Sequence, residues 1–457
     1  MKSTVKKTWS VGTLTYTAAG LVVLFGWLLW GDFSWSMKER AVNPTATLMI
    51  KSFGVSDFVY GLIIISFTNL TNIFLQPIIS YRSDRYRSKW GRRIPYLLKT
   101  TPFVAVGLIG LGLTPTLAGW MQNAIGVDRI SYNACGLTMF CIFWALLDFG
   151  TTLANAIFVA LANDVVPSAL IGRFMGMFRA VSLVCAVVFN YFLMGKAETH
   201  SKIIFITLGI LYGVGLLLMC LKVKEGEYPP PELPTEKTHG FFGAVKNYFS
   251  ECFTLPYYRW LIITPVLCQV AMIPFNTYVI FYAKDIGLTM EQLGHYYALV
   301  FGIAFITSYT MGSLADRFHP LRVGIASMIF LTVTMLVGGF IATEIKPFLV
   351  IFVIQSVAIM AYNTLIASYG QRLFPKALFA QFNSAYLMIQ GIGFTVVAPL
   401  TGKYLDLTGN HYNHVFFIGS FIALAGFLCL VVVLRYFKHL GGDENYQAPE
   451  PLPVKTD

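Results

Sequence analysis

Two ionisable residues, Asp148 and Arg179, interrupt long apolar stretches of this 457-residue chain. Thr152 and Asn155 follow Asp148 by four and seven residues, which places all three side chains on one face of a helix. A carboxylate can accept hydrogen bonds from two hydroxyl groups, and it can take up a proton when desolvated. We expect Asp148 and Arg179 to approach one another or to converge on one ligand; the alternative is a structural pair between helices.

The elements that carry these residues are predicted to be membrane-spanning helices. The chain is 56% hydrophobic and only 12% charged, with a mean hydropathy of +0.65, whereas soluble domains carry about 25% charged residues. This composition excludes an ordinary soluble protein. The apolar segments long enough to cross a bilayer are 11–31, 57–80, 95–114, 133–163, 174–195, 203–221, 260–283, 292–314, 321–342, 347–370, 381–402 and 413–436.

The twelve spans form two groups of six. We predict an N-terminal half over 1–221, a cytoplasmic linker over 222–258 and a C-terminal half over 259–440, followed by a disordered cytoplasmic tail over 441–457. The linker is rich in charge and proline, and its part from 241 to 258 is expected to form an amphipathic helix at the membrane face. Fold class is therefore all-α membrane protein, with twelve transmembrane helices in two pseudo-symmetric halves.

A short internal repeat supports this division. Ser83-Asp84-Arg85 follows the second span, and Ala315-Asp316-Arg317 follows the eighth, at the same place in the other half. Repeated six-span halves are typical of alternating-access transporters, whose solute site lies between the halves near the midplane.

The basic residues predict the orientation. The formal net charge is +11, and most of the Lys and Arg residues outside the spans fall on the side that carries both termini. Because such residues are enriched in cytoplasmic loops, both termini are predicted to be cytoplasmic in a plasma or inner membrane. The positive charge is thus a topology signal, and we expect no nucleic-acid partner.

The loop after the second span resembles a known signature. It begins at Gln76 and reads Gln-Pro-Ile-Ile-Ser-Tyr-Arg-Ser-Asp-Arg-Tyr-Arg-Ser-Lys-Trp-Gly-Arg-Arg-Ile-Pro. This resembles loop 2–3 of the major facilitator superfamily and, within it, the glycoside–pentoside–hexuronide cation symporters and sucrose-transporter-like proteins. The resemblance implies a sugar or glycoside solute, bound by an acidic residue of span 4 and an arginine of span 5, here Asp148 and Arg179.

The same loop suggests a gate. Asp84 lies beside Arg85 and Arg92, and such a carboxylate can pair with arginines and cap a helix N-terminus, which holds one conformation closed. Asp316 and Arg317 are the equivalent pair in the second half. The alternative is positive-inside charge with a simple turn.

Span 2 departs from the sodium-coupled members of the resembled family. Asn69, Asn72 and Gln76 form one polar stripe, and the family's sodium-binding aspartates correspond to Asn72 and Gln76. A hard cation favours charged oxygen ligands, so we expect coupling to protons rather than sodium. The amides either line the solute cavity or form hydrogen bonds between helices.

The second half offers amides in place of mid-span charges. Amides and aromatic rings suit a polyol, because its hydroxyls need donors and acceptors and its ring face can lie on an aromatic ring. Trp27 of the first span is a candidate for such a ring. The amide candidates are Gln269, Asn276, Gln355, Asn383 and Gln390.

The sequence therefore predicts a secondary active transporter of a sugar or glycoside, coupled to protons and working by alternating access. We expect a monomer in the lipid bilayer, with no catalytic residues, cofactor or metal site. The alternatives are an exporter or exchanger of another polar metabolite, and a membrane sensor that does not transport.

Overall fold

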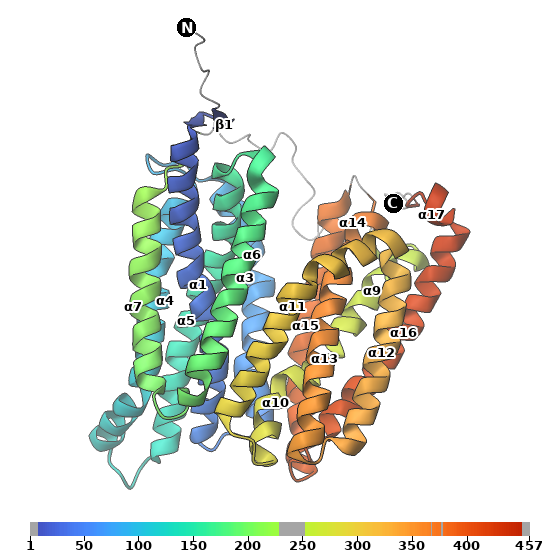
Figure 1. The fold of residues 1–457 in the computed structure, drawn as a ribbon. Coiled ribbons are helices and arrows are strands. Elements are labelled where there is room, and N and C mark those ends of the chain that lie inside the picture. The colour runs from blue at the N-terminus through green and yellow to red at the C-terminus, as the bar shows by residue number, and fades with distance from the viewer. Residues whose placement is uncertain (1–7, 228–251, 367, 376–377, 450–457) are drawn as a thin grey trace, which may run out of the picture. The chain divides into compact units, whose positions relative to one another are not determined.

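The computed structural model describes residues 8–227, 252–366, 368–375 and 378–449, and its long elements are all helices (Figure 1). Within these residues, eleven helices are long and apolar enough to cross a membrane, and they match eleven of the predicted spans. The remaining predicted span, 292–314, falls on helix α11 (Met290–Phe318). The predicted all-α membrane fold is confirmed; a small antiparallel hairpin of β1 (Trp9–Val11) and β2 (Leu14–Tyr16) precedes the first helix.

The chain divides into two compact units. The first comprises Met1–Val55, Thr71–Leu233 and Met290–Ala298. In it, α4 packs against α5 and α7, and α1 packs against α6 and α7 (Figure 1). Its elements after the hairpin are α1 (Ala18–Ser52), α3 (Phe67–Arg85) from Thr71 onward, α4 (Ile94–Ile125), α5 (Tyr132–Val165), η2 (Ser168–Leu170), α6 (Ile171–Val188), η3 (Phe189–Leu193), η4 (Met194–Lys196) and α7 (Ser201–Lys222).

Helix α1 corrects the prediction for the first span. It begins at Ala18, where the Thr17 hydroxyl caps it by accepting a hydrogen bond from the Gly20 backbone N–H at 3.2 Å. It then continues without a break to Ser52, whereas the sequence prediction ended the span at residue 31, just before Asp32. That boundary was wrong because the charges after residue 31 were assigned to a loop, whereas the unit accommodates them within the helix.

Helices α4 and α5 approach closely beside Asp148. A Cβ atom placed on Gly107 of α4 would lie 2.8 Å from the backbone N of Leu147 on α5. Only a residue without a side chain allows this approach. The backbone next to Asp148 is therefore held directly against α4.

The second unit comprises Ser56–Leu70, Pro234–Thr289 and Leu299–Asp457. In it, α12 packs against α13 and α16, while α9 packs against α15 and α16. Besides the start of α3 and the larger part of α11, its elements are α2 (Asp57–Tyr60), η1 (Gly61–Ser66), α9 (Pro256–Val270), α10 (Ile273–Asp285), α12 (Pro320–Ile341), α13 (Ile345–Ile366), α14 (Tyr369–Leu373), α15 (Phe379–Leu407), α16 (His414–His439) and α17 (Gly442–Asn445).

The short helix α2 is anchored to α15 within this unit. The backbone N–H groups of Asp57 and Phe58 donate to the two carboxylate oxygens of Asp406, each at 2.9 Å. A carboxylate at a helix N-terminus satisfies N–H groups that have no partner inside the helix and interacts favourably with the helix dipole.

The structure describes little of the predicted linker helix and more of the predicted tail. Most of the predicted amphipathic helix over 241–258 lies outside the described residues, and α9 already begins at Pro256. In the tail, the Tyr446 hydroxyl donates to the Leu373 backbone oxygen at 2.6 Å and lies 2.8 Å from the Tyr257 hydroxyl. These contacts and α17 lie within the predicted tail, whose disorder stays a prediction.

Candidate functional site

Asp148 lies in the interior of the first unit. Its side chain on α5 is only 7% exposed, and its carboxylate accepts a hydrogen bond from the Thr71 hydroxyl of α3. Next to this contact, the Thr152 hydroxyl donates to the Asn72 side-chain oxygen at 3.0 Å. Polar side chains predicted from two separate spans are thus brought together. Of the residues predicted beside them, Asn155 and Gln76 are exposed.

The sequence reasoning missed a lysine that is buried in the same unit as Asp148. Lys38 of α1 is 4% exposed, and its ammonium lies 4.1 Å from the centroid of the Trp35 ring and 5.8 Å from that of Tyr212 on α7. A cation over a desolvated aromatic face is stabilised by about 2 kcal/mol.

The predicted approach of Asp148 and Arg179 stays a prediction. Arg179 is exposed on α6, and the contact described for Asp148 is with Thr71. One turn further along α6, Ser182 instead accepts a hydrogen bond from Arg40 of α1 at 2.9 Å. Trp27, the proposed aromatic platform, is half-buried on α1.

Asp32 and Glu39 are two further charged residues of α1. Asp32 is fully buried and accepts a hydrogen bond from Ser36 at 3.2 Å, and Glu39 accepts one from the Trp35 ring N–H at 3.1 Å. Both contacts join residues four apart, the spacing of neighbours on a helix. That spacing was the signal in the sequence that the helix continues through these charges.

The second unit contains a cavity of about 340 Å³, a volume within the range that holds a small solute. Tyr369, Gln371, Asn383 and Tyr386 supply its polar lining, so it includes one predicted residue, Asn383.

The other predicted amides of this unit have different surroundings. The Gln269 side-chain amide donates to the Asn363 side-chain oxygen at 2.8 Å. Gln355 is fully buried, and among the described residues neither of its amide atoms has a hydrogen-bond partner. Asn276 is exposed and Gln390 is half-buried.

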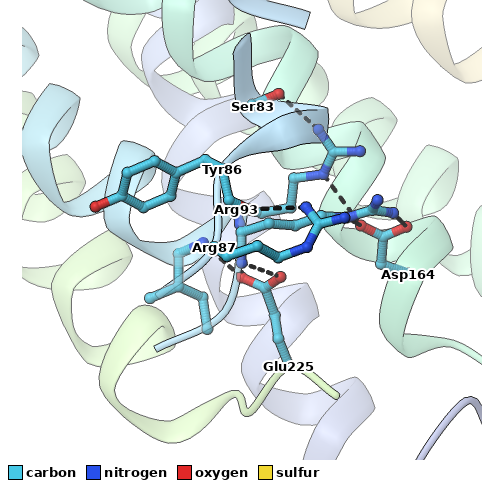
Figure 2. A network of polar contacts seen from close by, with 8 residues as sticks. Ser83, Tyr86, Arg87, Arg93, Asp164 and Glu225 are labelled. Atoms are coloured by element: carbon cyan, nitrogen blue, oxygen red, sulfur yellow. Dashed lines mark hydrogen bonds and ion pairs between the residues drawn. The ribbon is translucent and has the colours of Figure 1, made fainter. Parts of the chain in front are cut away.

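A polar network surrounds the start of α4, and Figure 2 shows it from close by. Arg92 donates to both carboxylate oxygens of Asp164 on α5, from Nε at 3.0 Å and from Nη2 at 2.7 Å. Arg93 donates to the same carboxylate at 3.0 Å and to the Ser83 hydroxyl at 2.6 Å. Arg92, which was predicted to act in a gate, is thus paired, and its described carboxylate partner is Asp164.

Glu225, just after α7, caps helix α4 in this network. Its carboxylate accepts hydrogen bonds from the backbone N–H groups of Arg92, Arg93 and Ile94 at 2.9, 2.8 and 2.6 Å. Gly91 precedes them with φ +99°, and a Cβ atom there would lie 2.4 Å from the Glu225 carboxyl carbon. The sequence reasoning missed both Asp164 and Glu225, because neither lies near the loop in the sequence.

The other residues that were predicted to act in a gate are described only in part. The side chains of Asp84, Arg85 and Asp316 lie outside the described residues, so their predicted pairing stays a prediction. Arg317 is exposed, and its guanidinium lies 5.4 Å from the centroid of the neighbouring Phe318 ring.

Several proteins of known name are similar in sequence. The chain is 27% identical to mouse (Mus musculus) solute carrier family 45 member 4 over 248 residues, which is 51% of this chain and 30% of that protein. It is 23% identical to the sucrose transport protein SUT1 of Oryza sativa over 34% of this chain and 28% of the relative. Mouse proton-associated sugar transporter A is 29% identical over 28% and 16%. The chain spans less than a third of the length of each relative.

Solved structures extend the similarity to nearly the whole chain. A D-xylose–proton symporter is 14% identical with a TM-score of 0.62, over 94% of this chain and 97% of that one. The nucleoside transporter NupG is 11% identical with a TM-score of 0.62, over 91% and 99%. At these identities the similarity establishes the fold. The family model described as Major Facilitator Superfamily matches residues 17–396 and 271–454, and the chain therefore belongs to the Major Facilitator Superfamily.

Proposed function

We propose that this protein is a secondary active transporter that moves a sugar or glycoside together with protons, by alternating access. The observation that carries the proposal is the buried Asp148 carboxylate of α5, which is bonded to the Thr71 hydroxyl. The names of the relatives, among them a sucrose transport protein and a proton-associated sugar transporter, point in the same direction.

Asp148 has the chemistry for both roles. When ionised it accepts hydrogen bonds from hydroxyl groups, as it already does from Thr71, so a solute hydroxyl can take the place of that threonine. When protonated it still offers one O–H donor and an acceptor oxygen to a solute hydroxyl, and it loses a charge that is costly to keep inside a membrane. Binding of a proton and binding of a polyol at one carboxylate link the two transported species.

The balance of charge on α1, α5 and α6 favours a neutral solute. Away from the helix ends, α1, α5 and α6 carry equal numbers of acidic and basic side chains, and amides from α3 complete the polar set. An anionic or cationic solute would leave an unpaired charge at membrane depth, which is costly. The charged side chains are Asp32, Glu39, Asp148, Lys38, Arg40 and Arg179.

We further propose that both termini are cytoplasmic in a plasma or inner membrane and that the monomer is the working unit. Lys38 and Arg40 counted against this orientation, and they now drop out of the comparison because they lie within α1 rather than in the loop that follows it. Both had been assigned to the side with fewer basic residues. Without these two residues, the difference in the number of basic residues between the two sides is larger.

The test is uptake of radiolabelled disaccharides into proteoliposomes, with and without an imposed inward proton gradient. We expect accumulation that depends on the gradient and that Asp148→Asn abolishes, while labelled solute still exchanges across the membrane in the absence of a gradient. Wild-type uptake that does not depend on the proton gradient would rule out proton coupling. If no tested sugar is transported but another polar metabolite is, the proposed solute class is wrong.

A further inference from the structure

Helices α11, α12 and α13 border an apolar groove of about 580 Å³. All of its lining residues belong to the second unit. Among the described lining residues, only Ser327 carries a polar side chain, so the groove suits hydrocarbon rather than a sugar. The lining residues lie between Ile303 and Leu314 on α11, between Val323 and Phe330 on α12, and between Val353 and Ala361 on α13.

The groove has the depth of one leaflet of a bilayer. Helix α12 has 22 residues and is therefore about 33 Å long, close to the thickness of a hydrocarbon core of about 30 Å. On this helix the groove begins at Val323, three residues after the start at Pro320, and extends to Phe330, ten residues after it. These positions lie about 4.5 and 15 Å along the helix axis. The groove thus runs from one end of the helix to about its middle.

Lipid is the medium that surrounds this groove. Helix α12 is long and apolar enough to cross a membrane, and two lining side chains, Phe330 and Ile354, are exposed at this depth. Exposure of such side chains to water is unfavourable, and an unfilled groove would lose the dispersion contacts of its walls. A hydrocarbon chain therefore fills the groove better than water does.

Two arginines continue the walls of the groove toward the end of the helices. Arg322 lies four residues before Ala326, a lining residue of α12, and Arg317 lies three residues after Leu314 of α11. Residues three or four apart share a helix face, so each arginine extends a row of residues that lines the groove. Both arginine side chains are exposed. Arg322 already binds one anion, because its guanidinium donates to the Asp443 carboxylate.

We propose that this groove binds an anionic phospholipid, with one acyl chain between α11, α12 and α13 and the phosphate on Arg317 and Arg322. A guanidinium matches a phosphate through two parallel hydrogen bonds, and basic side chains between membrane-spanning helices bind lipid headgroups. A zwitterionic headgroup would bring its own cation beside the two arginines, which disfavours it. The inference depends on the membrane fold and not on the identity of the solute.

The experiment titrates the purified protein in detergent with dioleoyl phosphatidylglycerol or dioleoyl phosphatidylcholine, and native mass spectrometry measures the bound lipid. We expect wild type to bind phosphatidylglycerol more tightly than phosphatidylcholine. The double variant Arg317→Gln/Arg322→Gln should bind phosphatidylglycerol about tenfold more weakly, the effect of losing one hydrogen bond to a charged group. Arg129→Gln/Lys202→Gln removes two exposed charges elsewhere and should bind as wild type does.

A second set of variants tests the acyl-chain site and the ion pair. Ala326→Phe adds a ring inside the groove from an exposed position, so the fold should tolerate it, and phosphatidylglycerol binding should be lost. Val214→Phe, at an exposed position of α7, is the matched control and should retain binding. Asp443→Asn removes the carboxylate that competes for Arg322, so it should bind the lipid at least as tightly as wild type.

Several results would overturn the inference. These are equal binding of the two lipids by wild type, and wild-type binding of phosphatidylglycerol by either R317Q/R322Q or A326F. Weaker binding by D443N would also overturn it, because the arginines would then act through the ion pair and not on the phosphate. If A326F does not accumulate in the membrane, Ala358→Leu fills the same groove and the same loss is expected. A wild type that transports no sugar contradicts the proposed function and leaves these lipid measurements unaffected.

Discussion

Arg92 and Asp164 are joined by two parallel hydrogen bonds, Nε to Oδ2 at 3.0 Å and Nη2 to Oδ1 at 2.7 Å. This two-point arrangement is the strong geometry of an arginine–carboxylate pair. Both side chains are largely shielded, at 20% and 15% exposed. The pair ties the start of α4 to the end of α5, and Arg93 donates to the same carboxylate.

Asp164→Asn should therefore lower stability. The amide keeps the shape but loses the charge that two arginines share, and hydrogen bonds to charged groups contribute about 2 kcal/mol. Thermal unfolding of the purified protein in detergent measures this as a lower Tm. Asp128→Asn, at an exposed acidic residue before α5, is the matched control and should leave the Tm in place. Equal melting of the two variants would contradict a structural role for the pair.

Gly91→Ala should disrupt the cap on α4. The glycine adopts φ +99°, which L residues rarely reach, and the new Cβ atom would lie 2.4 Å from the Glu225 carboxyl carbon. We expect a loss of about 1–3 kcal/mol, the usual cost of a residue held in an unfavourable backbone region. Gly119→Ala, on the same helix with no neighbouring atom within 4 Å, should unfold at or above the wild-type temperature. A G91A protein as stable as G119A would show that Glu225 moves away without cost.

Asp406→Ala should loosen α2. The carboxylate accepts the backbone N–H groups of Asp57 and Phe58, and removal of such a cap costs about 1 kcal/mol. Hydrogen exchange followed by mass spectrometry should then show faster exchange of the amides of residues 57–60. Asp285→Asn alters an exposed acidic residue at the end of α10 and should leave that exchange unchanged. Protection of 57–60 that persists in D406A would mean that other contacts hold the helix.

Gln355→Leu should raise stability. Both amide atoms of this fully buried side chain lack a partner among the described residues, and each unsatisfied buried group costs about 1–3 kcal/mol. Gln269→Leu is the matched comparison, because it breaks the 2.8 Å bond to Asn363 and should lower the Tm. If Gln355 binds the solute, the Q355L protein should be more stable than wild type and should also lose sugar uptake. A lower Tm for Q355L would contradict the view that this amide is an unsatisfied group.

The apolar segments, the family and the burial of Asp148 within a span could all be predicted from the sequence. A span is recognised by the average hydropathy of about twenty consecutive residues, which is a local property of the chain. The buried carboxylate was predicted for the same reason, since a single charge stands out in an apolar run. The amide face of span 2 was also found, because Asn72 lies at helical spacing from its neighbours and now bonds to Thr152.

Only the tertiary structure decided which charges lie inside and which residues pair with them. Averaged hydropathy ended the first span before Asp32, whereas packing of α1 against α6 and α7 buries Asp32 and Lys38 within one continuous helix. The partners of Arg92 are 72 and 133 residues away, and no local pattern identifies an acceptor at such a distance. Burial of a charge depends on the groups that neighbouring helices bring to it, and those neighbours are fixed by folding, not by sequence spacing.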